Sequence, residues 1–300
     1  MLRNFSDKRI RIRLLAIADG EPCLASVEER ERAFASYVRN VIMVLDRSPL
    51  GRLLVRSAML HHVSVGLDPL LEPDSSIFYP TVNHFDLGYQ PALVQKTEKG
   101  LSRYLTSFLH ALRRSWHYHS GRGPDFSLKP EDFLKLSRCE EADVVAAAHL
   151  AAWELRSAGV PFLWRHFLSD ADGDIAVVFE HCVADNPQNQ FNGIALKAAF
   201  NQWFAEKERI AACDHFALEM LDAALVQRPL QRGLGSETLR QTAIEGIGVM
   251  PNGLNYLAGS QLSGPWYEGL DDEFNRIPLQ HIQEDMRHLP GAADIERQNR

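Results

Sequence analysis

The chain has 300 residues, of which 45% are hydrophobic and 24% are charged. This composition can form the core of one large domain or of two closely packed domains, and it gives no sign of a disordered or fibrous chain. The formal net charge of -7 argues against a general nucleic-acid-binding protein, because neutralising phosphates requires a basic surface.

The N-terminus is the local exception to this acidic balance. Residues 8–18 alternate between apolar and polar, as in a strand with one wet face. Nucleic-acid binding through this strand is a minor alternative, and we expect no nucleic-acid partner. The apolar run at 14–18 has five residues, whereas a secretory signal needs roughly 7–15. The basic residues of this region are Arg3, Lys8, Arg9, Arg11 and Arg13.

Compartment can be inferred from apolar runs and from cysteine usage. No stretch approaches the roughly 18 apolar residues of a transmembrane helix, so we expect no membrane segment. The cysteines, which include no closely spaced pair, are Cys23, Cys139, Cys182 and Cys213. Free thiols in a reducing compartment are the simplest interpretation, which predicts a cytoplasmic protein.

Helical periodicity dominates the rest of the chain. One helix is predicted over 26–46, and the next begins at Ser48-Pro49, where a capping serine precedes a proline at the first helical position. Three short extended segments follow at 62–68, 76–80 and 82–87. Further helices are predicted at 97–119, 130–158, 161–169, 174–183, 194–204, 206–226 and 279–288, with loops at 120–130 and 184–193.

These elements predict an α+β fold that is predominantly helical, with a small sheet packed against a helical bundle. In the helix at 97–119 an apolar stripe is expected to face the core, with Arg103, Arg113 and Arg114 off the stripe or at its edge. We expect a single domain over 1–260. Residues 261–300 are then a C-terminal extension that packs on this domain or trails from it.

The most informative unit is the set of strands followed by the helix that carries His110. Zinc peptidases present two histidines four residues apart on one helix, a glutamate beside the first as general base, and an acidic ligand from a later helix. Positions i and i+4 share one helix face about 6 Å apart, so two imidazoles can bind one ion. Here the helix reads HALRRSWH from His110, and the next helix carries Glu140, Glu141 and Asp143.

In the order of its passages the chain resembles a bacterial family described as putative metallopeptidases, of zincin-like type. The likeness covers about residues 45–260, and the order of the passages carries it more than any single one. The passages are SPLGRLL at 48–54, the Tyr-Pro, Asn and Leu positions within 79–87, LSRCEEADVVAAAHLAAWELRSAG at 136–159, DIAVVFE at 174–180, NGIALKAAFNQWF at 192–204 and MPNGLNYL at 250–257.

The resemblance implies a zinc-binding helix that reads HELRHAWQ or close to it, and this chain departs from that pattern at two positions. Ala111 stands where the general-base glutamate is expected, and Arg114 replaces the second histidine. The resemblance places His110 at the first ligand position and Glu141 at the third, with Asp143 as a residue that would support the ligands. Loss of a positioned base typically costs 10²–10⁴ in rate. An arginine adds a fixed positive charge beside any would-be metal ion.

The favoured hypothesis is therefore a pseudoenzyme, a peptidase-like scaffold that serves as a binding or structural module without an intact metal site or a cofactor. It predicts that Arg114 pairs with Glu141 in place of the metal. A pocket lined by His110, Arg114 and Glu141 would hold an anionic group, so a partner protein, a peptide or a small acid is the expected ligand. The oligomeric state is left open.

The alternative is a zinc-dependent hydrolase or peptidase with a rebuilt site, formed by His110, Glu141 and a strand histidine such as His84. No spacing pattern supports that set. The chain has no Gly-x-Ser-x-Gly sequence, so a serine hydrolase has no motif in its favour. Glu140 is expected on a solvated helix face.

Overall fold

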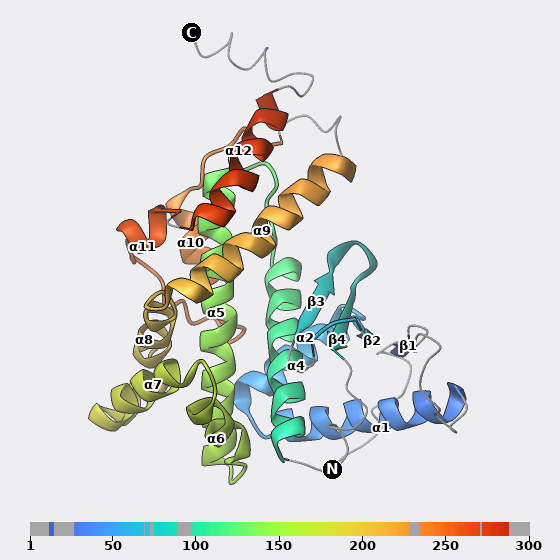
Figure 1. The fold of residues 1–300 in the computed structure, drawn as a ribbon. Helices are drawn as coiled ribbons and strands as arrows, with labels where there is room; N and C mark the ends of the chain where they lie inside the picture. Colours follow the sequence, from blue (N-terminus) through green and yellow to red (C-terminus); the bar gives the residue numbers. More distant parts are fainter. Residues whose placement is uncertain are drawn as a thin grey trace.

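The computed structural model describes residues 12–14, 27–68, 70–72, 75–88, 98–227, 234–270 and 272–287. These residues form the predicted α+β fold, in which helices predominate and one small sheet lies at the side (Figure 1). Of the predicted N-terminal strand the structure describes only β1 (Ile12–Leu14). The basic residues that precede it and Cys23 lie outside the described residues.

The sheet has the strand order β1-β2-β4-β3, where β2 is Ser64–Asp68, β3 is Ser76–Tyr79 and β4 is His84–Gly88. β2 pairs in parallel with β1 and with β4, and β3 is an antiparallel edge strand on β4. The short 3-10 helix Pro80–Val82 and Asn83, whose φ of 51° is left-handed, reverse the chain between β3 and β4. The three predicted extended segments are thus confirmed.

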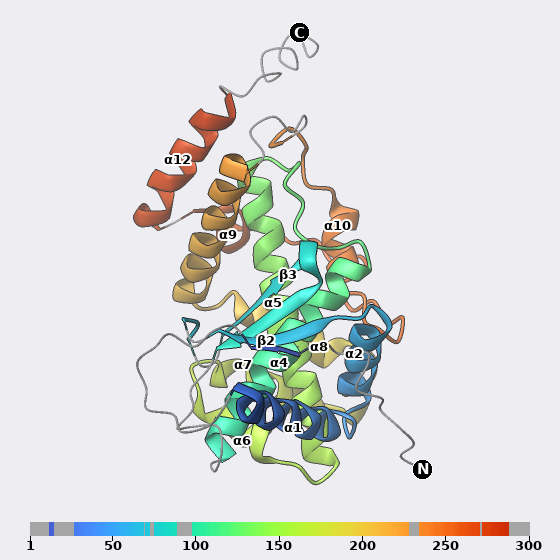
Figure 2. The same cartoon turned by 90° about the vertical axis from the view of Figure 1, so that its right-hand side faces the viewer.

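The two faces of the sheet differ in chemistry because successive side chains of a strand point to opposite sides. Val65, Leu67 and Phe85 are buried in the main hydrophobic core, where the Phe85 ring meets Phe108 of α4 (Glu98–His119) edge-on. Residues of the opposite parity, such as Ser64 and His84, lie on the other face. Figure 2 shows the sheet in front of α4, so this polar face is turned away from the helices behind it.

The remaining regular structure is helical. Its bounds match the predicted ranges closely as far as residue 227, whereas the helices at 241–247 and 265–268 were not predicted and the last helix starts earlier than predicted. Besides α4, the helices are α1 (Val27–Leu45), α2 (Pro49–Leu60), α5 (Pro130–Ser157), α6 (Phe162–Ser169), α7 (Gly173–Asp185), α8 (Ile194–Trp203), α9 (Lys207–Gln227), α10 (Gln241–Ile247), α11 (Pro265–Glu268) and α12 (Glu273–Arg287), with a second 3-10 helix at Pro187–Gln190. None of the described helices is both long and apolar enough to cross a membrane.

α5 is the central helix of the molecule, and α4 lies between it and the sheet (Figure 1). Alanines such as Ala147 and Ala151 are fully buried along α5, and their small side chains leave room for α2, α4, α6, α8 and α9 to contact it. The start of α2 is tied to α5 as well. Ser48 caps α2 by accepting a hydrogen bond from the Gly51 N–H at 2.9 Å, and its hydroxyl donates to Glu154 of α5.

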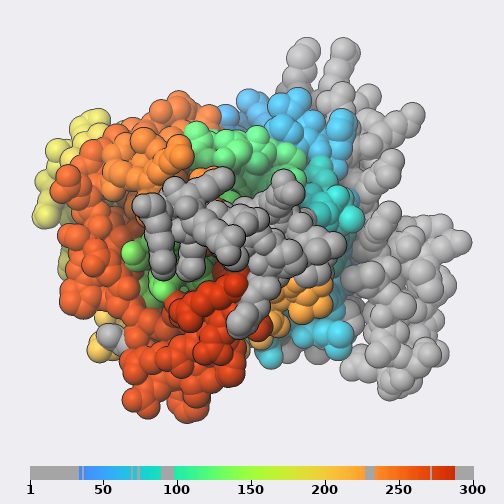
Figure 3. All heavy atoms as spheres, turned by 90° about the horizontal axis from the view of Figure 1, so that it is seen from above, coloured from blue at the N-terminus to red at the C-terminus, as the bar shows by residue number. Residues whose placement is uncertain are grey.

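The C-terminal segments pack on this body. In Figure 3 the orange and red residues of the C-terminal part border the green residues of α4 and α5. α12 packs on α9 with Leu279, Ile282 and Met286 in a second hydrophobic cluster. The predicted start of this helix at 279 was wrong: α12 begins at Glu273 and contains Pro278. A proline inside a helix costs roughly 3 kcal/mol, which the packing on α9 offsets. The domain division at residue 260 stays a prediction.

His149 shows how α5 carries titratable groups into the core. The side chain is buried, its Nδ1 lies 2.9 Å from the Val145 carbonyl oxygen, and its ring stacks on Phe167 with centroids 4.3 Å apart. Burial lowers the pKa of His149 to about 4. The imidazole is therefore neutral at pH 7, and charging it opposes folding.

We predict that His149→Phe makes the free energy of unfolding depend less steeply on pH between pH 4 and 7. The unfolded chain binds a proton near pH 6.5 and the folded chain only near pH 4, so wild-type stability falls as the pH drops through this window. One such proton contributes up to about 1.4 kcal/mol per pH unit. Urea unfolding at pH 4 to 7 measures the slope. His215→Phe is the control, because His215 is an exposed residue of α9. An equal slope in His149→Phe and wild type would contradict the prediction.

Candidate functional site

A buried ion pair joins α4 to α5 at the centre of the candidate site. Arg113 of α4 and Asp143 of α5 have fully buried side chains, with Arg113 Nε 2.6 Å from Asp143 Oδ2 and Arg113 Nη2 2.9 Å from Oδ1. This bidentate geometry is the strongest that an arginine and a carboxylate can form. The Asp143 carboxylate stays ionised: burial opposes the charge, but Arg113 and His117 outweigh it and lower the pKa of Asp143 to about 2.

The same pair holds the segment that follows α10. Arg113 Nη2 donates to the carbonyl oxygens of Ile247 at 3.1 Å and Val249 at 3.0 Å. The Tyr256 hydroxyl donates to Asp143 Oδ1 at 2.7 Å. The buried Arg113–Asp143 pair therefore holds two helices and the chain from Ile247 to Tyr256 together.

The sequence predicted that Arg113 lies off the apolar stripe or at its edge. It did not predict that Arg113 is buried. α4 is covered on two sides, by the sheet and by α5, so a residue outside the apolar stripe still faces protein. His117 of α4 is also buried, and its Nε2 lies 2.9 Å from Asp143 Oδ2. Burial lowers the pKa of His117, with Arg113 acting in the same direction.

Next to this pair lies the ion pair predicted from the sequence. Arg114 Nη2 donates to Glu141 Oε2 at 2.6 Å, and Arg114 Nη1 donates to the Ser76 hydroxyl at 3.3 Å. The prediction that Arg114 reaches Glu141 is confirmed. Both side chains are about 30% exposed, at 30% and 29%, so the pair stands at the edge of the protein interior. Burial acts against the charge of Glu141, yet Arg114 and His110 lower its pKa.

Glu140, expected on a solvated face, is instead half-buried. Its Oε1 atom is buried and has no hydrogen-bond partner among the described residues. Burial raises the pKa of Glu140 to about 8, and the neighbouring Glu141 and Asp143 charges act in the same direction against Arg114. The expectation failed because α5 has neighbours on nearly every side, which leaves little solvated face at this level.

The two remaining motif positions have different surroundings. His110 is half-buried and neutral near pH 7, because burial and the Arg114 charge lower its pKa to about 4. Ala111 is completely buried in the main core. A glutamate at this position would sit among apolar side chains rather than beside a solvent-filled cleft.

These residues do not fit a zinc ion. Zinc sites in proteins use three or four nitrogen, sulfur or oxygen ligands, and here His110 and Glu141 are accompanied by a guanidinium. Within the described ranges, no group of three or more His, Cys, Asp or Glu side chains is placed to hold a metal. His84, proposed as a third ligand of a rebuilt site, has its two ring nitrogens 2.7 Å from Ser64 Oγ and 2.8 Å from Asp86 Oδ1.

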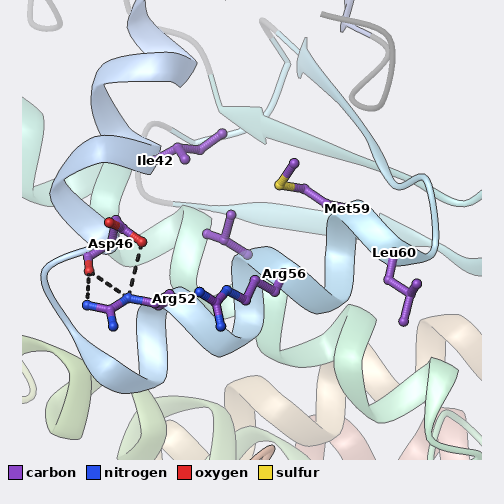
Figure 4. A pocket seen from close by; sticks show the side chains of 7 residues that line it. Ile42, Asp46, Arg52, Arg56, Met59 and Leu60 are labelled. Atoms are coloured by element: carbon purple, nitrogen blue, oxygen red, sulfur yellow. Dashed lines mark hydrogen bonds and ion pairs between the residues drawn. The ribbon is translucent and has the colours of Figure 1, made fainter. Parts of the chain in front are cut away.

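Two surface pockets lie away from this site. One, of about 260 Å³, lies between α1 and α2, where Arg52 Nε is 3.2 Å from Asp46 Oδ1 (Figure 4). The other, of about 360 Å³, lies at the start of α4 beside Glu98 and Arg165. Neither is lined by His110, Arg114 or Glu141, so a ligand pocket on those three residues stays a prediction.

A family model described as "Putative metallopeptidase family (DUF6782)" matches residues 91–258, more than half of the chain. The chain belongs to this family. The matched region contains the helices α4 to α10 and thus both ion pairs. The strands β2, β3 and β4, which lie within the resemblance over 45–260, precede the matched region. Neither the curated proteins nor the solved structures gave a match.

We predict that Asp143→Ala strongly destabilises the protein. The substitution leaves the Arg113 guanidinium buried without its carboxylate, and breaking a buried pair in this way costs roughly 3–5 kcal/mol. Asp46→Ala is the matched control, because its partner Arg52 is exposed and such pairs contribute about 0–1 kcal/mol. Urea unfolding gives both values, and a similar small loss in the two variants would refute the central role of Asp143.

The Arg114–Glu141 pair is expected to couple more weakly, because both side chains reach solvent. A double-mutant cycle with Arg114→Met and Glu141→Gln should give a coupling energy of about 1–2 kcal/mol, between the values for exposed and buried pairs. The same cycle on the exposed pair Arg165 and Glu98 should give less. A coupling near zero for Arg114 and Glu141 would show that their contact does not contribute to stability.

Proposed function

We propose that this member of the family no longer catalyses metal-dependent peptide hydrolysis, and that its Arg114–Glu141 ion pair takes the place of the metal site. The observation that carries the proposal is the 2.6 Å contact between Arg114 Nη2 and Glu141 Oε2. A carboxylate that accepts this strong charge-assisted bond is already neutralised, and a metal ion would have to displace a guanidinium that stays protonated.

The state of the general-base position supports the same proposal. Ala111 has no group that can accept a proton from water, and its burial in the core leaves no access for substrate. A positioned base contributes typically 10²–10⁴ in rate. The chain would therefore need to regain two functions, metal binding and proton transfer, to act as a peptidase of this type.

We propose further that the scaffold serves as a binding or structural module. Arg114 is the group that an anionic ligand would seek, and a peptide carboxylate or a small acid would have to compete with Glu141 for it. This competition favours a ligand that offers two oxygens to the guanidinium over one that offers a single charge.

Metal content tests the proposal directly. We expect protein purified without a histidine tag, incubated with zinc and desalted, to retain far less than one zinc ion per chain in elemental analysis. Arg114→His should take up zinc, because it restores two imidazoles at i and i+4 beside Glu141. Arg114→Gln, which removes the charge without adding an imidazole, is the matched control.

The decisive contrary result is one tightly held zinc ion in the wild-type chain that is lost on His110→Ala or Glu141→Ala. Such a result would mean that Arg114 leaves the ion pair to admit a metal. Zinc uptake by Arg114→His that disappears when His110→Ala is added would show that the scaffold still presents a metal-binding geometry and that Arg114 alone blocks it.

A further inference from the structure

The polar face of the sheet carries a chain of hydrogen bonds that plays no part in the ion pairs described above. Ser64 Oγ lies 2.7 Å from His84 Nδ1, and His84 Nε2 lies 2.8 Å from Asp86 Oδ1. All three residues precede the region matched by the family model. A nucleophile bonded to a base that a third group orients is the geometric signature of nucleophilic catalysis, whatever the order of the residues in the chain.

The direction of these bonds follows from the charge of Asp86. An ionised carboxylate only accepts hydrogen bonds, so His84 Nε2 carries the proton that it donates to Asp86. In the neutral imidazole the other nitrogen, Nδ1, is then an acceptor, and the Ser64 hydroxyl donates to it. In this tautomer His84 Nδ1, at 2.7 Å, is the nearer acceptor of the Ser64 hydroxyl, and the Asn83 carbonyl oxygen, at 3.4 Å, is its second acceptor.

The backbone holds this arrangement in place. Ser64 and His84 are direct partners in the parallel pairing of β2 with β4, and Asp86 lies two residues further along β4 on the same face. Groups on paired strands are held more precisely than groups on loops. The register of the sheet therefore places Ser64 beside His84 and keeps Asp86 on the same face.

We propose that Ser64 is a nucleophile activated by His84 and Asp86, and that it accepts the acyl group of short-chain carboxylic esters. Ser64 and His84 are each 8% exposed and Asp86 is 2% exposed. Because so little of these side chains reaches solvent, the proposed substrate is a small ester rather than a folded polypeptide.

The reaction requires only water as a second reactant. The Ser64 oxygen attacks the ester carbonyl carbon while its proton passes to His84 Nδ1. The C–O bond to the alcohol then breaks, and the alcohol leaves with that proton. Water attacks the acyl-serine in the same way, giving its proton to His84 and releasing the carboxylic acid, and the proton on His84 returns to the Ser64 oxygen. Asp86 positions the ring through its contact with Nε2.

Tyr79 completes the polar face. It is the partner of His84 in the antiparallel pairing of β3 with β4, and the two rings stack with centroids 6.4 Å apart. Burial raises the pKa of Tyr79, and the charges of Asp86 and Asp68 act in the same direction. The phenol therefore keeps its proton at neutral pH.

A fluorophosphonate probe tests the proposal on the full-length protein. The Ser64 oxygen would attack phosphorus, fluoride would leave, and the serine proton would pass through His84 to solvent. We expect intact-mass and peptide mapping to show one adduct, on Ser64, in the folded protein and none after denaturation. Ser107, a buried serine of α4 bonded to the Arg103 carbonyl oxygen, is the internal control and should stay unlabelled.

Substitutions test whether Ser64 reacts because His84 activates it or only because the probe can reach it. His84→Gln should slow labelling of Ser64 at least 100-fold, within the range for loss of a general base. Asp86→Asn should also slow labelling, because the His84 proton would no longer be held on Nε2. Thermal unfolding checks that the variants fold, and hydrolysis of p-nitrophenyl acetate should fall in Ser64→Ala. Absence of a Ser64 adduct in the folded wild type, or an unchanged rate in folded His84→Gln, would overturn the proposal. Neither outcome bears on the zinc measurement.

Discussion

The arrangement of the candidate site depends on the buried ion pair between Arg113 of α4 and Asp143 of α5. Two fully buried charges are costly to remove from water, and they are tolerated only when geometry and further hydrogen bonds satisfy them. Here two contacts join the ions, Tyr256 adds a donor to the carboxylate, and two backbone carbonyls accept from the guanidinium. The pair thereby sets how α4 lies against α5 and where the chain after α10 must run.

The exposed pair follows from the buried one. As the chain moves from Arg113 to Arg114 along α4, the partner on α5 moves back from Asp143 to Glu141. Partners that run in opposite directions are what antiparallel neighbours present to each other. With this register fixed, Arg114 is carried to Glu141 at the edge of the interior while Ala111 is turned into the core. One interhelical register thus accounts for the positions of Ala111, Arg114 and Glu141 together.

Sequence reasoning reached the fold class and the helix bounds as far as residue 227, because apolar periodicity and caps such as Ser48 act locally. It also reached Arg114 and Glu141, since both stood at positions given by the resemblance. It missed the burial of Arg113 and Glu140, because a stripe on one helix does not reveal a second covering surface. It missed the bonds that join Ser64, His84 and Asp86 as well. Strand register brings those residues together over a distance of twenty residues, and no short motif records such a pairing.

Arg114 differs from a bound ion in one respect that matters for the molecule as a whole. A zinc ion must be captured from solution and can be taken away again by a chelator, so a scaffold that relies on it is only as stable as the local supply of metal allows. A guanidinium is covalently part of the chain and meets Glu141 whenever α4 and α5 come together. With Arg114 in place of the metal, as we propose, this edge of the fold assembles under metal starvation, without waiting for a cofactor to be loaded.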